Sequence, residues 1–305
     1  MIIGVTIGGN SITTTKIETK TNSILENTLV TIPIDNKADA NTIIEQWICS
    51  LQKVISTFTE EEFLEGIGIA IPGPFDYHNG IFAFKMNQKY TSLFCINIKE
   101  IIVKKLQLTD HIPVRFYNDA ACFGIGEVWK GKLKTIQRGL GIILDTGFGA
   151  TFLYHGLPVL SGEEIPKDGE LYHIPYKDGI ADDYFSTRWL INRYNRCSTT
   201  TTITTIKELI KVSLNNDLVA LQTFNKFSEN LADFLAPWLK SYNAEAISIG
   251  GSISNAWPFF GKSLEKRLRT QGSTVKIYKS DLQEKAILLG SARLINDIFY
   301  KGLPF

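Results

Sequence analysis

Two glycine-containing hairpins, one at the start of the chain and one near its middle, limit the possible folds more than any other feature. Residues 2–7 form a β-branched run that ends at Gly8-Gly9, and residues 12–18 resume in rough alternation. This pattern predicts two strands joined by a tight glycine turn. Residues 139–153 (GLGIILDTGFGATFL) predict a second hairpin with a similar layout. The sequence therefore predicts a duplicated architecture.

Strands and helices are predicted to alternate around the two hairpins. Residues 42–58 place apolar side chains three and four positions apart, which indicates a core-facing amphipathic helix. The apolar part of GIGIAIPGP at 66–74 predicts a buried strand that the prolines end. Further strands are expected at 114–117, 246–251 and 274–278, and further helices at 97–108, 118–130, 182–195, 204–214, 217–241, 256–270 and 284–300.

The size and charge of the chain exclude several classes of protein. Its 305 residues favour two domains, each large enough to bury a core, and 44% hydrophobic against 21% charged residues excludes a disordered chain. Lysine and arginine number 32 against 31 acidic residues, so the net charge of +1 creates no basic field for nucleic acid. The first residues lack the basic region and long apolar run of a signal peptide or membrane span. We expect no nucleic-acid and no membrane partner.

The cysteines indicate a reducing compartment. They lie far apart, form no CxxC motif and have no histidine at metal-ligand spacing. This usage predicts unpaired thiols, a cytoplasmic location and no structural zinc. The four are Cys49, Cys95, Cys122 and Cys197.

Short polar or glycine motifs follow the predicted strands in a fixed order. They are Gly8-Gly9, PGP at 72–74, Asn118-Asp119, TGFG at 146–149 and IGGS at 249–252. Glycine turns let backbone N–H groups approach a phosphate chain, and an aspartate can accept a proton from an attacking hydroxyl. Each motif taken singly is more often an ordinary turn.

Taken together, the motifs resemble the ROK family (repressor, open reading frame, kinase) of sugar kinases and sugar-responsive regulators, within the actin-like ATPase superfamily. The resemblance covers nearly the whole chain, through GVTIGGNSI at 4–12, GIGIAIPGPFD at 66–76, YNDAACFGIGE at 117–127, LGIILDTGFG at 140–149, AISIGGSISNA at 246–256 and AILLGSARL at 286–294. It implies an α/β fold of two actin-like (ribonuclease H-like) domains around an interdomain cleft. The expected domains are residues 1–117, joined by a C-terminal helix of about 290–305, and residues 118–289.

The resemblance also implies ATP-dependent phosphorylation of a hydroxyl on a hexose or hexose derivative. Asp119 would be the general base and Asn118 would bind the sugar, although Asn118-Asp119 also fits a helix N-cap, and the two interpretations are compatible. Asn87 resembles a sugar-contacting asparagine or is an ordinary loop residue. Glu170 and His173 in GELYHI resemble the family's GExGH, with Tyr172 in place of glycine; alternatively, His173 is a half-exposed strand residue.

By the same resemblance, the glycine loops would bind ATP with Mg²⁺. The implied ATP contacts are Gly8, Gly9, Asn10, Asp145, Thr146, Gly147, Gly149, Gly250 and Gly251. The chain lacks the cysteine run that binds zinc in most relatives, so no zinc is expected. The resemblance further implies a homodimer.

Two departures from the family pattern concern the metal. Thr6 stands where the family's DxGGT has an aspartate that orients hydrated magnesium. The absence of this carboxylate should slow phosphoryl transfer. Asp145 stands where the family has glycine, as in actin's second phosphate loop. Either Asp145 replaces the missing carboxylate and serves magnesium, or it repels the phosphates and the loop has decayed.

Three functions remain open at this point. The first is a sugar kinase that uses ATP, and the second is a catalytically impaired sugar-binding or sensor protein of the same fold. Thr6 and Asn10 favour the second, and Asp119 favours the first. A transcriptional repressor needs a helix-turn-helix, which we do not expect because the first predicted strand begins at residue 2. The sequence does not choose among hexoses and amino sugars.

Overall fold

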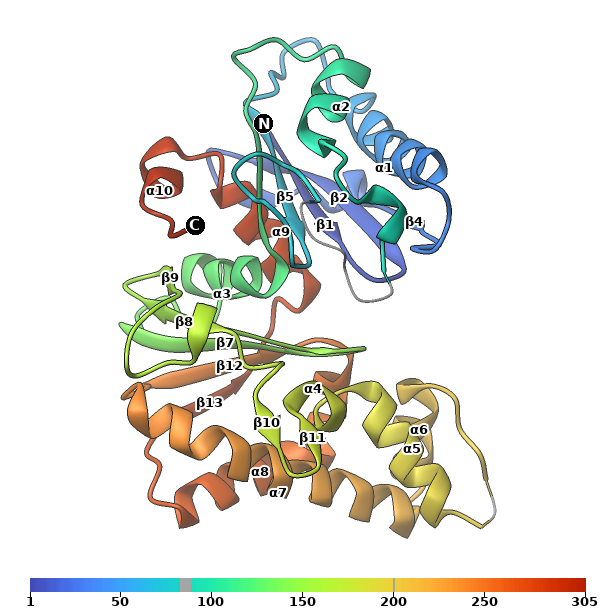
Figure 1. Ribbon diagram of the computed structural model, residues 1–305, viewed down its shortest axis with the longest axis vertical. Helices are drawn as coiled ribbons and strands as arrows, with labels where there is room; N and C mark the ends of the chain where they lie inside the picture. The colour runs from blue at the N-terminus through green and yellow to red at the C-terminus, as the bar shows by residue number, and fades with distance from the viewer. Residues whose placement is uncertain (83–88, 200) are drawn as a thin grey trace. The chain divides into compact units, whose positions relative to one another are not determined.

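The computed structural model describes residues 1–82, 89–199 and 201–305. The chain forms two compact units, one of Met1–Lys130 with Glu284–Phe305 and one of Gly131–Gln283. Each unit has its own β-sheet with helices (Figure 1). The predicted α/β class is therefore confirmed.

The sheet of the first unit has the order β3-β2-β1-β5-β6, with β4 also paired to β2. Strands β1 and β2 are antiparallel, and β1, β5 and β6 run parallel. Every residue of β1 and β5 is buried, as expected for parallel strands covered on both faces. The strands are β1 (Ile2–Ile7), β2 (Ser11–Glu18), β3 (Ser23–Ile24), β4 (Val30–Pro33), β5 (Gly66–Ile71) and β6 (Val114–Asn118).

Several helices of the first unit begin at polar caps. Asp39 accepts a hydrogen bond from Thr42 N and starts the long helix α1, whose apolar stripe includes the buried Trp47. The helices are α1 (Ala40–Ile55), α2 (Ile98–Lys105), α3 (Asp119–Lys130), α9 (Glu284–Arg293) and α10 (Asp297–Lys301), with short 3₁₀ turns at Glu26–Thr28 and Thr91–Leu93.

Helices α3 and α9 pack backbone against backbone. A Cβ built on Gly290 would lie 1.8 Å from the Cys122 carbonyl oxygen, and one on Gly126 would lie 1.9 Å from the Ala286 carbonyl oxygen. Only glycine permits this approach. The crossing places α3 in the first unit, which therefore continues to Lys130, whereas the sequence suggested a boundary after residue 117. The C-terminal segment that belongs to the first unit begins at Glu284 in the structure, whereas the sequence suggested a start at about residue 290.

The single helix predicted at 284–300 is two helices in the structure. Helix α9 ends at Arg293, and α10 starts at Asp297. Asn296 separates them because its Oδ1 accepts a hydrogen bond from Phe299 N at 2.9 Å, which begins a new helix.

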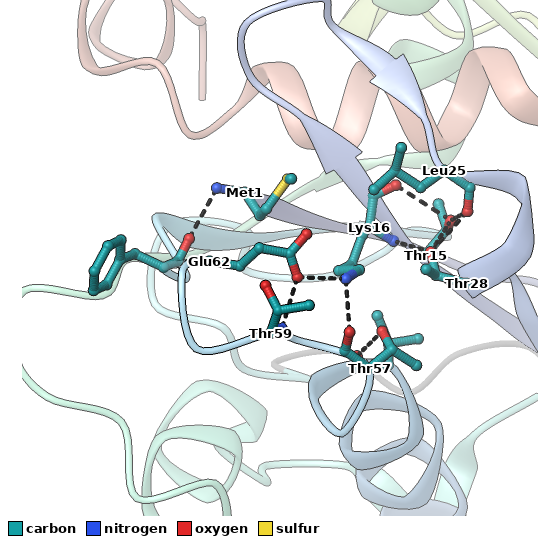
Figure 2. A network of polar contacts seen from close by, with 10 residues as sticks. Met1, Thr15, Lys16, Leu25, Thr28, Thr57, Thr59 and Glu62 are labelled. Carbon is teal, nitrogen blue, oxygen red and sulfur yellow. Dashed lines mark hydrogen bonds and ion pairs between the residues drawn. The ribbon is translucent and has the colours of Figure 1, made fainter.

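A buried lysine joins the sheet of the first unit to the segment after α1 (Figure 2). Lys16 on β2 has a side chain only 4% exposed, and its Nζ donates to Glu62 Oε2 at 2.7 Å and to the Thr57 carbonyl oxygen at 2.9 Å. The hydrogen bond from Lys16, followed by one from Thr59 N, lowers the pKa of Glu62 from its ordinary value of 4.5. The buried ammonium therefore has both a carboxylate and a carbonyl partner, which offset the cost of burying its charge.

Replacing Lys16 by methionine is expected to destabilise the protein, because Glu62 loses the cation that stabilises its ionised form. Since the folded pKa of Glu62 is lowered, its stabilisation is present above pH 4.5 and is lost as the pH falls through the folded value. The difference between wild type and Lys16→Met should therefore shrink below pH 4.5. Urea unfolding at neutral and acidic pH measures it, with the exposed Lys20→Met as control; a pH-independent difference would contradict this account.

The sheet of the second unit has the order β13-β12-β7-β8-β9. Strand β7 is antiparallel to β8, which gives the predicted second hairpin, and parallel to β12. The strands are β7 (Arg138–Leu144), β8 (Phe148–Tyr154), β9 (Leu157–Val159), β12 (Ala246–Gly250) and β13 (Lys276–Lys279), with a separate small hairpin of β10 (Pro175–Tyr176) and β11 (Gly179–Ile180).

Helices α7 and α8 pack together in the second unit and contribute much of its core. Phe224, Phe227 and Phe260 are fully buried there. The helices are α4 (Ala181–Tyr184), α5 (Thr187–Cys197), α6 (Ile206–Leu214), α7 (Leu218–Ser241) and α8 (Trp257–Thr270), with 3₁₀ turns at Lys167–Gly169 and Ser252–Ala256. Across the described residues, no helix has the length and apolarity needed to span a membrane.

Candidate active site

Three of the sequence motifs meet at one edge of the first unit's sheet. Strands β1, β5 and β6 are parallel neighbours, with Ala70 in register with both Thr6 and Tyr117. Their carboxyl ends lead directly into Gly8-Gly9, the 72–74 segment and Asn118-Asp119. In open α/β sheets this edge is where ligands bind.

In the turn after β1, three carbonyl groups accept hydrogen bonds, whereas two amide groups have no acceptor among the described residues. The carbonyl oxygens of Gly8, Gly9 and Asn10 accept hydrogen bonds from Tyr90 Oη at 2.5 Å, from Asn36 Nδ2 and from Ile34 N at 2.8 Å, respectively. Among the described residues, no group accepts a hydrogen bond from the N–H of Gly9 or of Asn10. Free amides in a glycine turn suit an anion.

Asn118 caps helix α3 and contacts a tyrosine. Its Oδ1 accepts from Ala121 N at 3.0 Å, the bond of an N-cap residue, and its Nδ2 donates to Tyr77 Oη at 3.3 Å. A Cβ on Gly73 would lie 2.9 Å from Tyr77 Oη, so the turn after β5 adjoins this pair. The predicted N-cap is therefore present, and it fixes the side chain next to Asp119.

Asp119 occupies the first turn of α3, where the helix dipole favours a negative charge. Its Oδ1 accepts a hydrogen bond from Ala120 N at 2.8 Å, while no described residue donates to Oδ2. The residue is half-buried, and desolvation raises the pKa of its carboxyl above the ordinary 3.8; the Ala120 bond and the charge of Lys89 act in the opposite direction. A raised pKa brings this carboxylate closer to the pKa of an efficient general base, which lies near the working pH.

The second hairpin turn is organised by Asp145. Its Oδ1 accepts from Thr146 N at 2.8 Å and from Ser252 Oγ at 2.7 Å. Ser252 reaches it because β12 lies beside β7, and a Cβ on Gly251 would lie 2.4 Å from the Leu144 carbonyl oxygen. The structure thus brings the TGFG and IGGS motifs together.

A second carboxylate, Asp182 of α4, also faces this turn. Its Oδ1 accepts from Phe148 N at 2.7 Å and would lie 2.9 Å from a Cβ on Gly147. Asp182 N donates to the Tyr172 carbonyl oxygen at 3.0 Å, and burial together with Glu170 and Asp182 raises the pKa of the Tyr172 hydroxyl. Asp182 therefore connects the second hairpin turn with the GELYHI segment.

Glu170 and His173 flank Tyr172 in the second unit. Glu170 follows the 3₁₀ turn at Lys167–Gly169, and His173 lies in a turn rather than in the strand suggested by one interpretation. The ring of His173 packs edge-on to that of Tyr172. Asn87 lies outside the described residues.

The structure adds four residues that sequence reasoning did not select. Tyr77 is hydrogen-bonded to Asn118, Ser252 to Asp145 and Asp182 to Phe148 N. The charge of Lys89 lowers the pKa of Asp119. For Ser252, its position within the IGGS motif at 249–252 was a usable signal. Tyr77 and Lys89 had none, because their roles depend on long-range packing.

No group of three or more potential ligands that could hold a metal ion occurs among the described residues. Magnesium needs few protein ligands, since it keeps several waters and binds substrate phosphates. Asp145 fits this use because two hydrogen bonds fix its Oδ1 and the group is a hard oxygen donor.

The sequence model of the ROK family matches residues 2–298. The chain belongs to the ROK family. Among curated ROK relatives, N-acetyl-D-glucosamine kinase of Aliivibrio fischeri is 25% identical over 272 residues, covering 80% of this chain and 85% of that protein. Glucokinase of Thermotoga maritima is 23% identical, over 97% of this chain and 97% of that protein.

Solved ROK structures share the fold. The ROK family glucokinase from Streptomyces griseus, crystallised with glucose and AMPPNP, superposes with a TM-score of 0.78 at 19% identity, over 96% of this chain and 98% of that one. A ROK transcriptional regulator, a homologue of the E. coli MLC protein, gives 0.80 at 20% identity, over 99% of this chain and 79% of that one. Since kinases and a regulator share it, the fold alone does not choose between these functions.

Proposed function

We propose that this ROK protein is a kinase that transfers the γ-phosphoryl group of ATP to a hydroxyl of a hexose or N-acetylhexosamine. The observation that carries the proposal is Asp119, a half-buried carboxylate at the same sheet edge as the amides of Gly9 and Asn10. Among the described residues, its Oδ2 has no donor and these two amides have no acceptor. A base and a phosphate-binding turn are what phosphoryl transfer needs. Relatives named as sugar kinases favour this over a sensor.

In the proposed reaction, Asn118 and Asp119 bind the sugar and Asp119 Oδ2 accepts the proton of its hydroxyl. The sugar oxygen forms a bond to the γ-phosphorus as the bond to the β–γ bridging oxygen breaks, and ADP leaves with that electron pair. The N–H groups of Gly9 and Asn10, which have no acceptor among the described residues, hold phosphate oxygens in place. Asn87, Glu170 and His173 are proposed as further sugar contacts. A cytoplasmic location, a homodimer and the lack of nucleic-acid and membrane partners remain part of the proposal.

Incubating the purified protein with ATP, Mg²⁺ and a panel of hexoses and N-acetylhexosamines, and measuring ADP, tests the activity directly. We expect sugar-dependent ADP release with at least one member of the panel. A sugar-induced rise in Tm without ADP above background would instead establish a sugar-binding protein and overturn the kinase.

Asp145 is the proposed protein ligand for Mg²⁺, directly or through water; bound there, the metal would neutralise charge on the phosphates. Mg²⁺ is expected to raise the affinity for ATP. In Asp145→Ala this increase should be about 10-fold smaller than in the wild type. Calorimetric titration of ATP with and without Mg²⁺ measures it, and Ser252→Ala, which removes one bond to Asp145, should show a smaller loss. Unchanged magnesium dependence in Asp145→Ala would remove the metal role.

A further inference from the structure

Lys89 is held next to the first glycine turn by its neighbour Tyr90. Tyr90 is 1% exposed, donates from Oη to the Gly8 carbonyl oxygen at 2.5 Å and from N to the Asn36 carbonyl oxygen at 2.9 Å, and has a φ of 54°. Asn36 in turn holds the Gly9 carbonyl oxygen. The backbone that carries Lys89 is thus fixed to the turn itself.

The ammonium group of Lys89 lies against Gly9. A Cβ built on Gly9 would lie 3.2 Å from Lys89 Nζ and 3.6 Å from its Cε, so the missing side chain of glycine makes room for the lysine. Lys89 is exposed, and no described carboxylate lies within salt-bridge distance of it. Within the described part of the chain, a cation without an ionic partner therefore lies beside two amide groups without an acceptor.

The charges around this turn favour an anionic ligand. Thr6 at the end of β1 brings no negative charge. Asp119 is an acidic group whose pKa the charge of Lys89 lowers. The buried Cys122 thiol also interacts with Asp119, and burial followed by the charge of Asp119 raises its pKa. Free N–H groups with a lysine ammonium form a recognised combination for phosphate oxygens.

We infer that Lys89 binds the terminal phosphate of the nucleotide at the Gly8-Gly9 turn and supplies there positive charge that does not depend on a carboxylate-held metal. This assignment rests on the proposed kinase function for its role in transfer, but the phosphate contact can be measured without transfer. Lys89 would also keep Asp119 ionised, since its charge lowers the pKa of that carboxyl.

Calorimetric titration with sodium tripolyphosphate and with ATP, both in EDTA, tests the contact in the absence of metal and sugar. Lys89→Met is expected to weaken both affinities about 10- to 100-fold, the loss of one charge-assisted hydrogen bond. Lys89→Arg should keep most of the affinity, and Lys53→Met, an exposed lysine of α1, should match wild type. Loss of affinity in Lys89→Met below about threefold, or no tripolyphosphate binding by wild type, would overturn the inference.

A second readout separates the phosphate contact from the kinase proposal. In an active enzyme, Lys89→Met should move the acid limb of the kcat/KM profile to higher pH, because Asp119 loses a nearby cation; an unmoved limb would contradict the effect on Asp119. If wild type binds tripolyphosphate through Lys89 but phosphorylates no sugar, the kinase proposal fails and the Lys89 assignment stands. If the wild type phosphorylates a sugar but Lys89→Met binds tripolyphosphate as well as the wild type does, the kinase proposal stands and the Lys89 assignment fails.

Discussion

Replacing Asp119 by asparagine is expected to lower kcat by about 10²- to 10⁴-fold while the affinity for sugar stays within a few-fold of wild type. Asparagine keeps an oxygen that can accept from Ala120 N, so the start of α3 should be preserved. It cannot take the proton of the attacking hydroxyl. ADP release and sugar titration on the same preparation measure the two effects, with the exposed Asp110→Asn as a matched control.

The pKa of Asp119 gives this substitution a second signature. Because burial raises its folded pKa above 3.8, the ionised carboxylate destabilises the fold at neutral pH and the effect disappears as the pH falls below 3.8. Asp119→Asn should therefore raise Tm at neutral pH while it removes activity. Wild-type activity should fall with pH through a limb that lies above 3.8. A variant that keeps more than about a fifth of wild-type kcat would rule Asp119 out as the base.

Replacing Gly290 by alanine is expected to destabilise the first unit by about 3 kcal/mol or more. The new Cβ would lie 1.8 Å from the Cys122 carbonyl oxygen, which is backbone of α3 and cannot rotate away as a side chain does. Helices α3 and α9 would have to separate. Because α3 carries Asp119 at its first turn, activity should fall together with stability.

Thermal unfolding, which should shift by about 10 °C for this change in free energy, measures the effect. Gly139→Ala is the matched control, since a Cβ on Gly139 would meet only side-chain atoms, the nearest at 3.3 Å. Its Tm should change little. Equal Tm values for Gly290→Ala and wild type would show that the two helices do not need this close contact.

The elements and their order were predictable because they depend on local patterns. Period-two and period-3.6 spacing of apolar residues identified the two hairpins and α1, and the strand ends at Gly8-Gly9 and Asn118-Asp119 followed from glycine and capping residues. The break at Asn296 was missed because a cap inside an apolar run is a weak local signal. The assignment of α3 to the first unit was missed because it depends on contact with α9, far along the chain.

The family, the α/β class and the order of the glycine and aspartate motifs can all be read from the order of residues along the chain. Which side chains meet depends on the folded arrangement: Lys89 lies against Gly9, Tyr77 contacts Asn118, and Asp182 lies at the turn before Phe148. Spacing along a strand or helix reports the element's own geometry, whereas contacts between distant segments depend on how strands pair and helices cross. The charge at the end of β1, where Thr6 brings none and Lys89 places a cation against Gly9, is of this second kind.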